Sequence, residues 1–197
     1  MFLTEIKLSD FEPGMVSAQG RFKLVSVCSD AKRRKSAMVF ETVQGMQVND
    51  QKQALLGLKM MLKLAQLGKP FNQLADARAV HEAFDAFYCD VTQKKETVWR
   101  YRHGDIRILF YYAADKVVLL THTLPKRTDK LSAKDIKLAK QAVVDFLTAE
   151  AFLRRMSMSA RVSLCICFYQ LALVTPGRLP LRACSLKQRR HIPNWRI

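Results

Sequence analysis

Apolar and polar side chains follow helical spacing over residues 50–68. Leucines recur three and four positions apart there, with lysines and glutamines between them, which is typical of a helix that buries one face. Gly68 and Pro70 mark the end of this helix, because glycine closes helices and proline cannot continue them. The predicted buried stripe consists of Leu55, Leu58, Leu62 and Ala65.

Helical spacing also predicts two further helices. A shorter one is expected over residues 75–88, with His81 on it as a structural histidine. A last helix is expected from Ser132 to about Thr148, because Ser132 and Asp135 have the spacing of a capping box. The buried stripe of this last helix would consist of Ile136, Ala139, Val143 and Phe146.

Strand-like segments lie on both sides of the first two predicted helices. One strand is expected over residues 21–27, and three more over 97–103, 106–112 and 117–124. Residues 1–20 are expected to be a lead-in, and residues 36–43 fit either a strand or the start of a helix. The predicted fold class is α+β: a small antiparallel sheet of the N-terminal strand plus three C-terminal strands, packed by two N-terminal helices and one C-terminal helix.

The stretch VWRYRHGDIRILFYY, residues 98–112, places three arginines in a predicted hairpin. A two-residue loop at Gly104-Asp105 would set Arg102 opposite Arg107. A second loop at Ala114-Asp115 would set Arg107 opposite His122. By alternation, one face would carry the core residues Trp99, Tyr101, Ile106, Ile108, Phe110, Tyr112, Val117 and Leu119. The other face would carry Arg100, Arg102, Arg107 and His122, with Leu109, Tyr111 and Leu120 along it.

Two arginines directly opposite each other call for an anion, because like charges repel across a sheet. The residues leave three possibilities: a carboxylate of the same chain lies between them, both guanidinium groups splay into water, or a phosphate binds there. Arginine suits phosphate because its planar fork binds two oxygens and keeps its charge. Lys126 and Arg127, which leave the third strand of this sheet, would lie beside the same face.

Charge and cysteine content narrow the class of protein. The chain has 197 residues and a net charge of +16, which predicts an anionic partner without identifying it. Five cysteines have spacings that fit neither a zinc site nor a redox pair. The first ten residues lack the pattern of a signal peptide, and the apolar run 162–174 is too short to span a bilayer. We expect a reduced, cytoplasmic protein.

The charge also changes along the chain. Nine of the 33 basic residues but none of the 17 acidic ones lie in residues 151–197. This change predicts a first domain over 1–150 and a basic C-terminal extension over 151–197. We expect the extension to be a poorly ordered tail or the product of translation past a lost stop codon. The alternatives are a membrane-surface or partner-binding segment and a nucleic-acid contact.

The segment WRYRHGDIRILFYYAADKVVLLTHTLPKR resembles the carboxyl-terminal half of RelE/ParE-superfamily toxins of bacterial toxin–antitoxin systems. The segment HTLPKRTDKLSAKDIKLAKQ is most similar to the phage-derived, HigB-like branch. The resemblance covers residues 50–148 and is strongest over 97–141, so it leaves the extension 151–197 without a counterpart. It implies a small α+β fold and an antitoxin from a neighbouring gene as partner.

The resemblance also implies an activity: cleavage of mRNA on the ribosome, without a metal or other cofactor, by attack of an RNA 2′-hydroxyl on the adjacent phosphate. The implied catalytic residues are Arg107, which stabilises the phosphate, a second arginine at Arg127, and Lys126 and His122 for proton transfer. The implied RNA-binding residues are Arg100, Arg102 and Lys130. A tyrosine that often follows the KR pair in RelE is absent here, so Lys126, Lys130 and His122 are all candidates for the base.

Two other functions fit the same resemblance. ParE-like members of the superfamily act on DNA gyrase and keep the fold without RNA chemistry. A phage-derived remnant could bind nucleic acid or an antitoxin without catalysis. The basic face favours RNA over gyrase.

Overall fold

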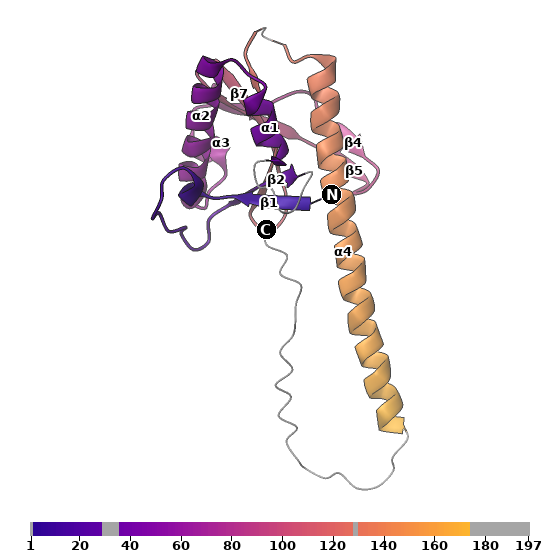
Figure 1. Ribbon diagram of the computed structural model, residues 1–197. Helices are drawn as coiled ribbons and strands as arrows, with labels where there is room; N and C mark the ends of the chain where they lie inside the picture. The colour runs from indigo at the N-terminus through magenta and orange to yellow at the C-terminus, as the bar shows by residue number, and fades with distance from the viewer. Residues whose placement is uncertain (1, 29–35, 128–129, 174–197) are drawn as a thin grey trace. The chain divides into compact units, whose positions relative to one another are not determined.

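The computed structural model describes residues 2–28, 36–127 and 130–173, and of residues 155–173 it describes the backbone alone (Figure 1). The chain divides between Leu147 and Thr148 into two compact units. The elements are, in order, β1 (Phe2–Ile6), the short helix η1 (Leu8–Asp10), β2 (Lys23–Cys28), α1 (Met38–Gln44), α2 (Val48–Gln66), α3 (Phe71–Leu74), β3 (Val80–Glu82), β4 (Phe87–Cys89), β5 (Lys94–Glu96), β6 (Val98–His103), β7 (Ile106–Tyr112), β8 (Val117–Pro125) and α4 (Ala133–Leu173).

The predicted α+β class is confirmed, but the main sheet is larger than expected and mixed. Its six strands follow the order β1-β2-β8-β7-β6-β3. The β2–β8 pair is parallel, whereas the other four pairs are antiparallel. Strands β4 and β5 form a separate antiparallel hairpin. The sheet therefore gains β1, β3 and a parallel pair relative to the sequence prediction.

Helices cover both faces of the first unit's sheet. One core cluster joins α1, α2 and α3 to side chains such as Ile106, Ile108 and Phe110. The second joins Ala139, Val143, Phe146 and Leu147 of α4 to the opposite face. Figure 1 shows α1 and α2 on one side and the start of α4 on the other. Strand β7 lies between these layers, so six of its seven residues are buried on one face or the other.

Helix α2 confirms the predicted helix over 50–68, with a shifted buried face. Leu58, Leu62 and Ala65 are buried as expected, but Leu55 is 39% exposed. Gly57 takes part instead, because a Cβ at this position would lie 3.1 Å from the Cβ of His103 and 3.2 Å from Ile108 Cδ1. The absence of a side chain at Gly57 lets the helix approach the sheet closely.

The predicted helix over 75–88 is wrong. Residues Val80–Glu82 form β3, which pairs with β6, and Phe87–Cys89 form β4 of the small hairpin. The apolar positions fit helical spacing, but backbone hydrogen bonds to the open edge of β6 outweigh this weak local preference. The expected lead-in over residues 1–20 is likewise wrong in part, because Phe2–Ile6 pairs with β2.

The register of the β6–β7 hairpin is confirmed, with His103 opposite Ile106 and Arg102 opposite Arg107. The next register is wrong. The β7–β8 turn is one residue longer than predicted, so Tyr112 faces Val118. A bulge between Leu109 and Phe110 adds a second shift, so Leu109 faces His122 and Arg107 faces Leu124. A one-residue shift exchanges the faces of a strand. Accordingly, Val118 and Leu120 lie in the first core cluster, and Val117 and Leu119 lie with the second.

Helix α4 begins as predicted and continues beyond the predicted end at Thr148, to Leu173. The amide of Asp135 donates to Ser132 Oγ at 3.1 Å, and that hydroxyl lies 2.6 Å from Asp135 Oδ2, so Ser132 caps the helix. Residues 174–197 lie outside the described residues, so poor order in the extension stays a prediction for them. Within the described residues, no helix combines the length and apolar character needed to cross a membrane.

Candidate functional site

Most of the predicted site residues gather at the end of the sheet where β6 turns into β7 and β8 ends. The turn uses Gly104 with φ +56°, a conformation that glycine adopts without strain. The amide of Lys126 donates to the carbonyl oxygen of Asp105 at 2.5 Å, which joins the end of β8 to this turn. We call Arg102, Arg107, Lys126 and Arg127 the cationic rim.

The two arginines of the hairpin lie on one face but differ in exposure. Arg102 is exposed, and its Nε donates to the carbonyl oxygen of Gly104 at 3.1 Å. Arg107 is 3% exposed and lies between Arg102 and Leu124. Both side chains are on the face that α4 covers, because the neighbouring Ile106 and Ile108 point towards α2. Arg102 is therefore the more accessible of the two to a ligand in solution.

Arg127 is held by the opposite helix layer. Its guanidinium donates to Asp50 Oδ2 at 2.5 Å, and Asp50 lies in the first turn of α2. The arginine side chain remains 62% exposed. The fold thus brings Arg127 to the same end of the sheet as Arg107 but ties it to the helix on the other face.

His122 is buried beside the start of α4. It is 2% exposed, and its Nε2 lies 3.8 Å from Asp135 Oδ1. Burial lowers its pKa to about 4, although the nearby Asp135 carboxylate acts in the opposite direction. His122 is therefore neutral at pH 7.

A hydrogen-bond chain selects the tautomer of His122. The hydroxyl of Thr121 donates to the carbonyl oxygen of Leu109 at 3.2 Å, and its oxygen lies 3.3 Å from His122 Nδ1. If the Thr121 hydroxyl donates to Leu109, the ring nitrogen Nδ1 is the donor to Thr121. This assignment leaves Nε2, on the side of Asp135, without a proton.

Arg100 has a partner within the sheet. Its guanidinium contacts the Nε2 atom of His81, which lies directly opposite on β3. Burial and the adjacent Arg100 charge both lower the pKa of His81. The sequence analysis expected His81 on a helix, but His81 lies on strand β3. Its side chain holds the guanidinium of Arg100 in place. His81, Arg100, Leu109 and His122 form one row across four strands.

The remaining candidate is Lys130, an exposed residue that precedes the Ser132 cap. The amino end of a helix carries a partial positive charge, so Lys130 and the start of α4 add to the positive potential near the cationic rim. Among the residues that the structure describes, no group of three or more His, Cys, Asp and Glu side chains could hold a metal ion.

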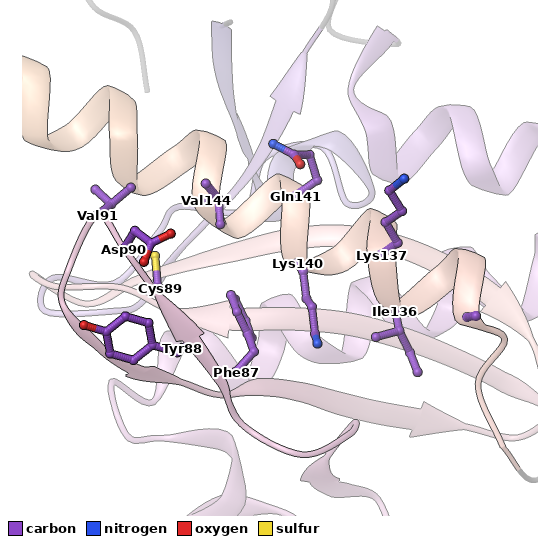
Figure 2. A pocket seen from close by; sticks show the side chains of 11 residues that line it. Phe87, Tyr88, Cys89, Asp90, Val91, Ile136, Lys137, Lys140, Gln141 and Val144 are labelled. Atoms are coloured by element: carbon purple, nitrogen blue, oxygen red, sulfur yellow. The ribbon is translucent and has the colours of Figure 1, made fainter.

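A groove that the sequence did not predict lies between α4 and the β4–β5 hairpin (Figure 2). Its volume is about 500 Å³. The groove is lined by Phe87, Tyr88, Cys89, Asp90, Val91, Ala133, Ile136, Lys137, Lys140, Gln141 and Val144. The aromatic pair in FYCDV was the signal in the sequence, but the expected helix over 75–88 concealed it.

Comparison with known proteins gives one family. Residues 58–144 match the model of the family described as "Phage derived protein Gp49-like (DUF891)", which is associated with toxin–antitoxin systems. No curated protein matches the chain. The matched segment contains the β6–β7 hairpin, all of β8 and the start of α4, and therefore every predicted site residue. The family agrees with the phage-derived origin expected from the sequence, and its description names neither RelE/ParE nor HigB.

Proposed function

We propose that this chain is the toxin of a toxin–antitoxin pair and that it cleaves mRNA on the ribosome without a metal. The observation that carries the proposal is the cationic rim, where Arg102 lies directly opposite Arg107 and the backbone of Lys126 is bonded to the same turn. The match to a phage-derived family associated with toxin–antitoxin systems supports the same function.

The proposed reaction needs positive charge at one phosphate. Attack of a 2′-hydroxyl on the adjacent phosphorus produces a pentacoordinate centre with extra negative charge, and only RNA carries that nucleophile. In the proposal, the exposed Arg102 and Arg127 contact phosphate oxygens, together with Lys126 and Lys130. Arg107, paired with Arg102 on the neighbouring strand, adds a permanent positive charge from within the sheet, while Arg100 contacts His81.

Proton transfer would be divided between histidine and lysine. A base must accept the 2′-hydroxyl proton, and an acid must protonate the departing 5′-oxygen. His122 fits the base, because its low pKa keeps the ring neutral at pH 7, so that one ring nitrogen is free to accept a proton. A lysine ammonium is a proton donor, so Lys126, beside the turn, fits the acid.

A second candidate function is binding without catalysis. Arg107 and His122 are 3% and 2% exposed, so neither side chain reaches solvent in this conformation. A phage-derived remnant that uses only the exposed Arg102, Arg127 and Lys130 would bind RNA or an antitoxin and would need no buried proton acceptor. This candidate predicts RNA affinity without strand cleavage.

The two functions are separated by inducing the full chain in a bacterial host, measuring growth and mapping mRNA 5′ ends. The proposed toxin arrests growth and produces new ends, whereas a binder produces none. Co-expression with the adjacent reading frame then tests for an antitoxin, which should form a stable complex and restore growth. Absence of both new ends and growth arrest would overturn the proposed activity.

A further inference from the structure

The groove between α4 and the β4–β5 hairpin has an apolar floor that is partly open to solvent. Ile136 and Val144 of α4 face it, and both are only partly buried. Across from them, Tyr88 is 57% exposed although it is large and aromatic. Figure 2 shows the hairpin side chains on one side of the groove and those of α4 on the other. Exposed apolar side chains gathered in a concave site are typical of a binding surface.

The rim of the same groove is mainly basic. Lys137 is exposed, and Lys140 Nζ lies 5.4 Å from the ring centroid of Phe87 and 5.5 Å from that of Phe84. Lys95 lies directly opposite Tyr88 in the hairpin and is exposed. One carboxylate, that of Asp90, also lines the groove. Contact with aromatic rings holds the Lys140 ammonium at the apolar floor, where it can meet an incoming carboxylate.

From this combination we infer that the groove binds a short acidic segment of a partner protein, with apolar side chains in the groove and carboxylates on Lys137 and Lys140. A volume of about 500 Å³ accommodates a few side chains and not a folded domain. An amphipathic helix laid in a groove is the mode of recognition that fits. In a toxin–antitoxin pair the antitoxin would supply the segment, and to that extent the inference rests on the proposed function.

Charge and chemistry favour this occupant over two others. A second copy of the chain would bring a protein of net charge +16 to a basic rim, and the charges would repel. RNA would satisfy the lysines, but the aliphatic side chains of Val91, Ile136 and Val144 offer nothing to a nucleotide. An acidic segment with apolar side chains can pack against the apolar floor and pair its carboxylates with the lysines of the rim.

The test begins with selection of displayed 12-residue peptides on the full-length protein, which needs no toxin activity. We expect the selected peptides to combine Asp or Glu with Leu, Ile or Phe. Binding of a synthetic selected peptide, measured by fluorescence anisotropy, should weaken at least tenfold in the double variant Lys137→Glu/Lys140→Glu. The charge-matched control Lys23→Glu/Lys69→Glu, at exposed positions away from the groove, should bind like the wild type.

A second variant tests whether weaker peptide binding could result from misfolding of the first. Tyr88→Asp changes an exposed side chain at the groove and should also weaken peptide binding tenfold, with an unchanged circular dichroism spectrum. A peptide with its acids replaced by lysines should recover binding to the Lys137→Glu/Lys140→Glu variant. Selection of peptides without acids, or equal binding to all variants, would overturn the inference. So would displacement of the peptide by a 20-nucleotide RNA, or a dimer that the groove variants dissociate.

Growth assays keep this inference separate from the proposed function. If the groove variants lose peptide binding but still arrest growth, the groove is a docking site apart from the RNA site. If peptide binding follows expectation and the wild type never arrests growth or cleaves mRNA, the docking site stands and the proposed activity fails.

Discussion

Arg102 on β6 lies directly opposite Arg107 on β7, and the two guanidinium groups occupy different environments. Arg102 is exposed and bonded to its own turn, whereas Arg107 is 3% exposed between two strands. Two like charges at opposed positions destabilise a sheet unless an anion or solvent compensates them. Of the two, the exposed Arg102 is the one that a phosphate can reach from solution, and the pair is the basis of the first prediction.

Replacing Arg107 by alanine should abolish growth inhibition while the fold persists. In the proposal Arg107 adds positive charge at the phosphate, and loss of one group that stabilises a developing oxyanion reduces rates by about 100- to 1000-fold. Growth after induction and the frequency of new mRNA ends are the measurements, with circular dichroism to verify folding. Arg78→Ala, at an exposed position before β3, is the matched control and should remain toxic. A folded Arg107→Ala protein with full toxicity would remove this residue from the mechanism.

Releasing Arg127 from Asp50 should strengthen RNA binding. Asp50→Asn removes the carboxylate that holds the arginine at 2.5 Å and leaves the side-chain shape almost unchanged. We expect affinity for a short RNA to rise about two- to fivefold at low salt, because a freed guanidinium can contact a phosphate. An exposed pair contributes about 0–1 kcal/mol, so thermal stability should barely change.

The control for Asp50→Asn is Glu150→Gln. It removes the same charge from another arginine pair, in which Arg154 donates to Glu150 at 2.6 Å. If both variants bind RNA equally well, overall charge and not the release of Arg127 explains any increase.

The pH dependence of stability should contain a contribution from His122. Its pKa is about 4 in the folded chain and about 6.5 when unfolded. Between these values the unfolded state binds the extra proton, so the free energy of unfolding rises with pH from 4 to 6.5. Over the whole interval from pH 4 to 6.5, the contribution of His122 to the free energy of unfolding rises by roughly 3 kcal/mol.

Chemical denaturation of the wild type and His122→Gln across this pH range measures the effect. Carboxylates also titrate at the acidic end, so the difference between the two proteins, and not either curve alone, reports on His122. Parallel curves would show that His122 is not held neutral by burial.

The Ser132 cap should stabilise the start of α4. Ser132→Ala removes the acceptor of the Asp135 amide and should cost about 1 kcal/mol, whereas Ser132→Asp, which also caps, should cost little. Urea unfolding measures both. Since Asp135 also faces His122, the alanine variant should in addition alter the pH dependence described above. Equal stability of the two variants would exclude a role for this cap.

A chain ending at Glu150 should fold and keep whatever activity the full chain has. Every buried side chain among the described residues lies at or before Leu147, and the compact first unit ends there. The truncation removes the surface ion pair between Arg154 and Glu150. Thermal unfolding and growth inhibition of the two proteins should agree, and a truncated chain that fails to fold would show that the extension completes the core.

Local signals in the sequence determined several parts of the molecule. The Gly104-Asp105 turn set the register that places Arg102 opposite Arg107, because a two-residue loop leaves adjacent strands one pairing. Ser132 set the start of α4 through a hydrogen bond three residues away. Helix α2 followed its leucine spacing. Each of these features depends on residues close together in the chain.

Tertiary structure decided what depends on distant residues. A β7–β8 turn one residue longer than predicted, followed by the bulge at Leu109/Phe110, moved His122 away from Arg107 and set which side chains of β8 face each core. Pairing with the open edge of β6 turned residues 80–82 into a strand. The ion pair between Arg127 and Asp50 joins residues 77 positions apart. Such contacts form only when the whole sheet is assembled, and no local pattern encodes them.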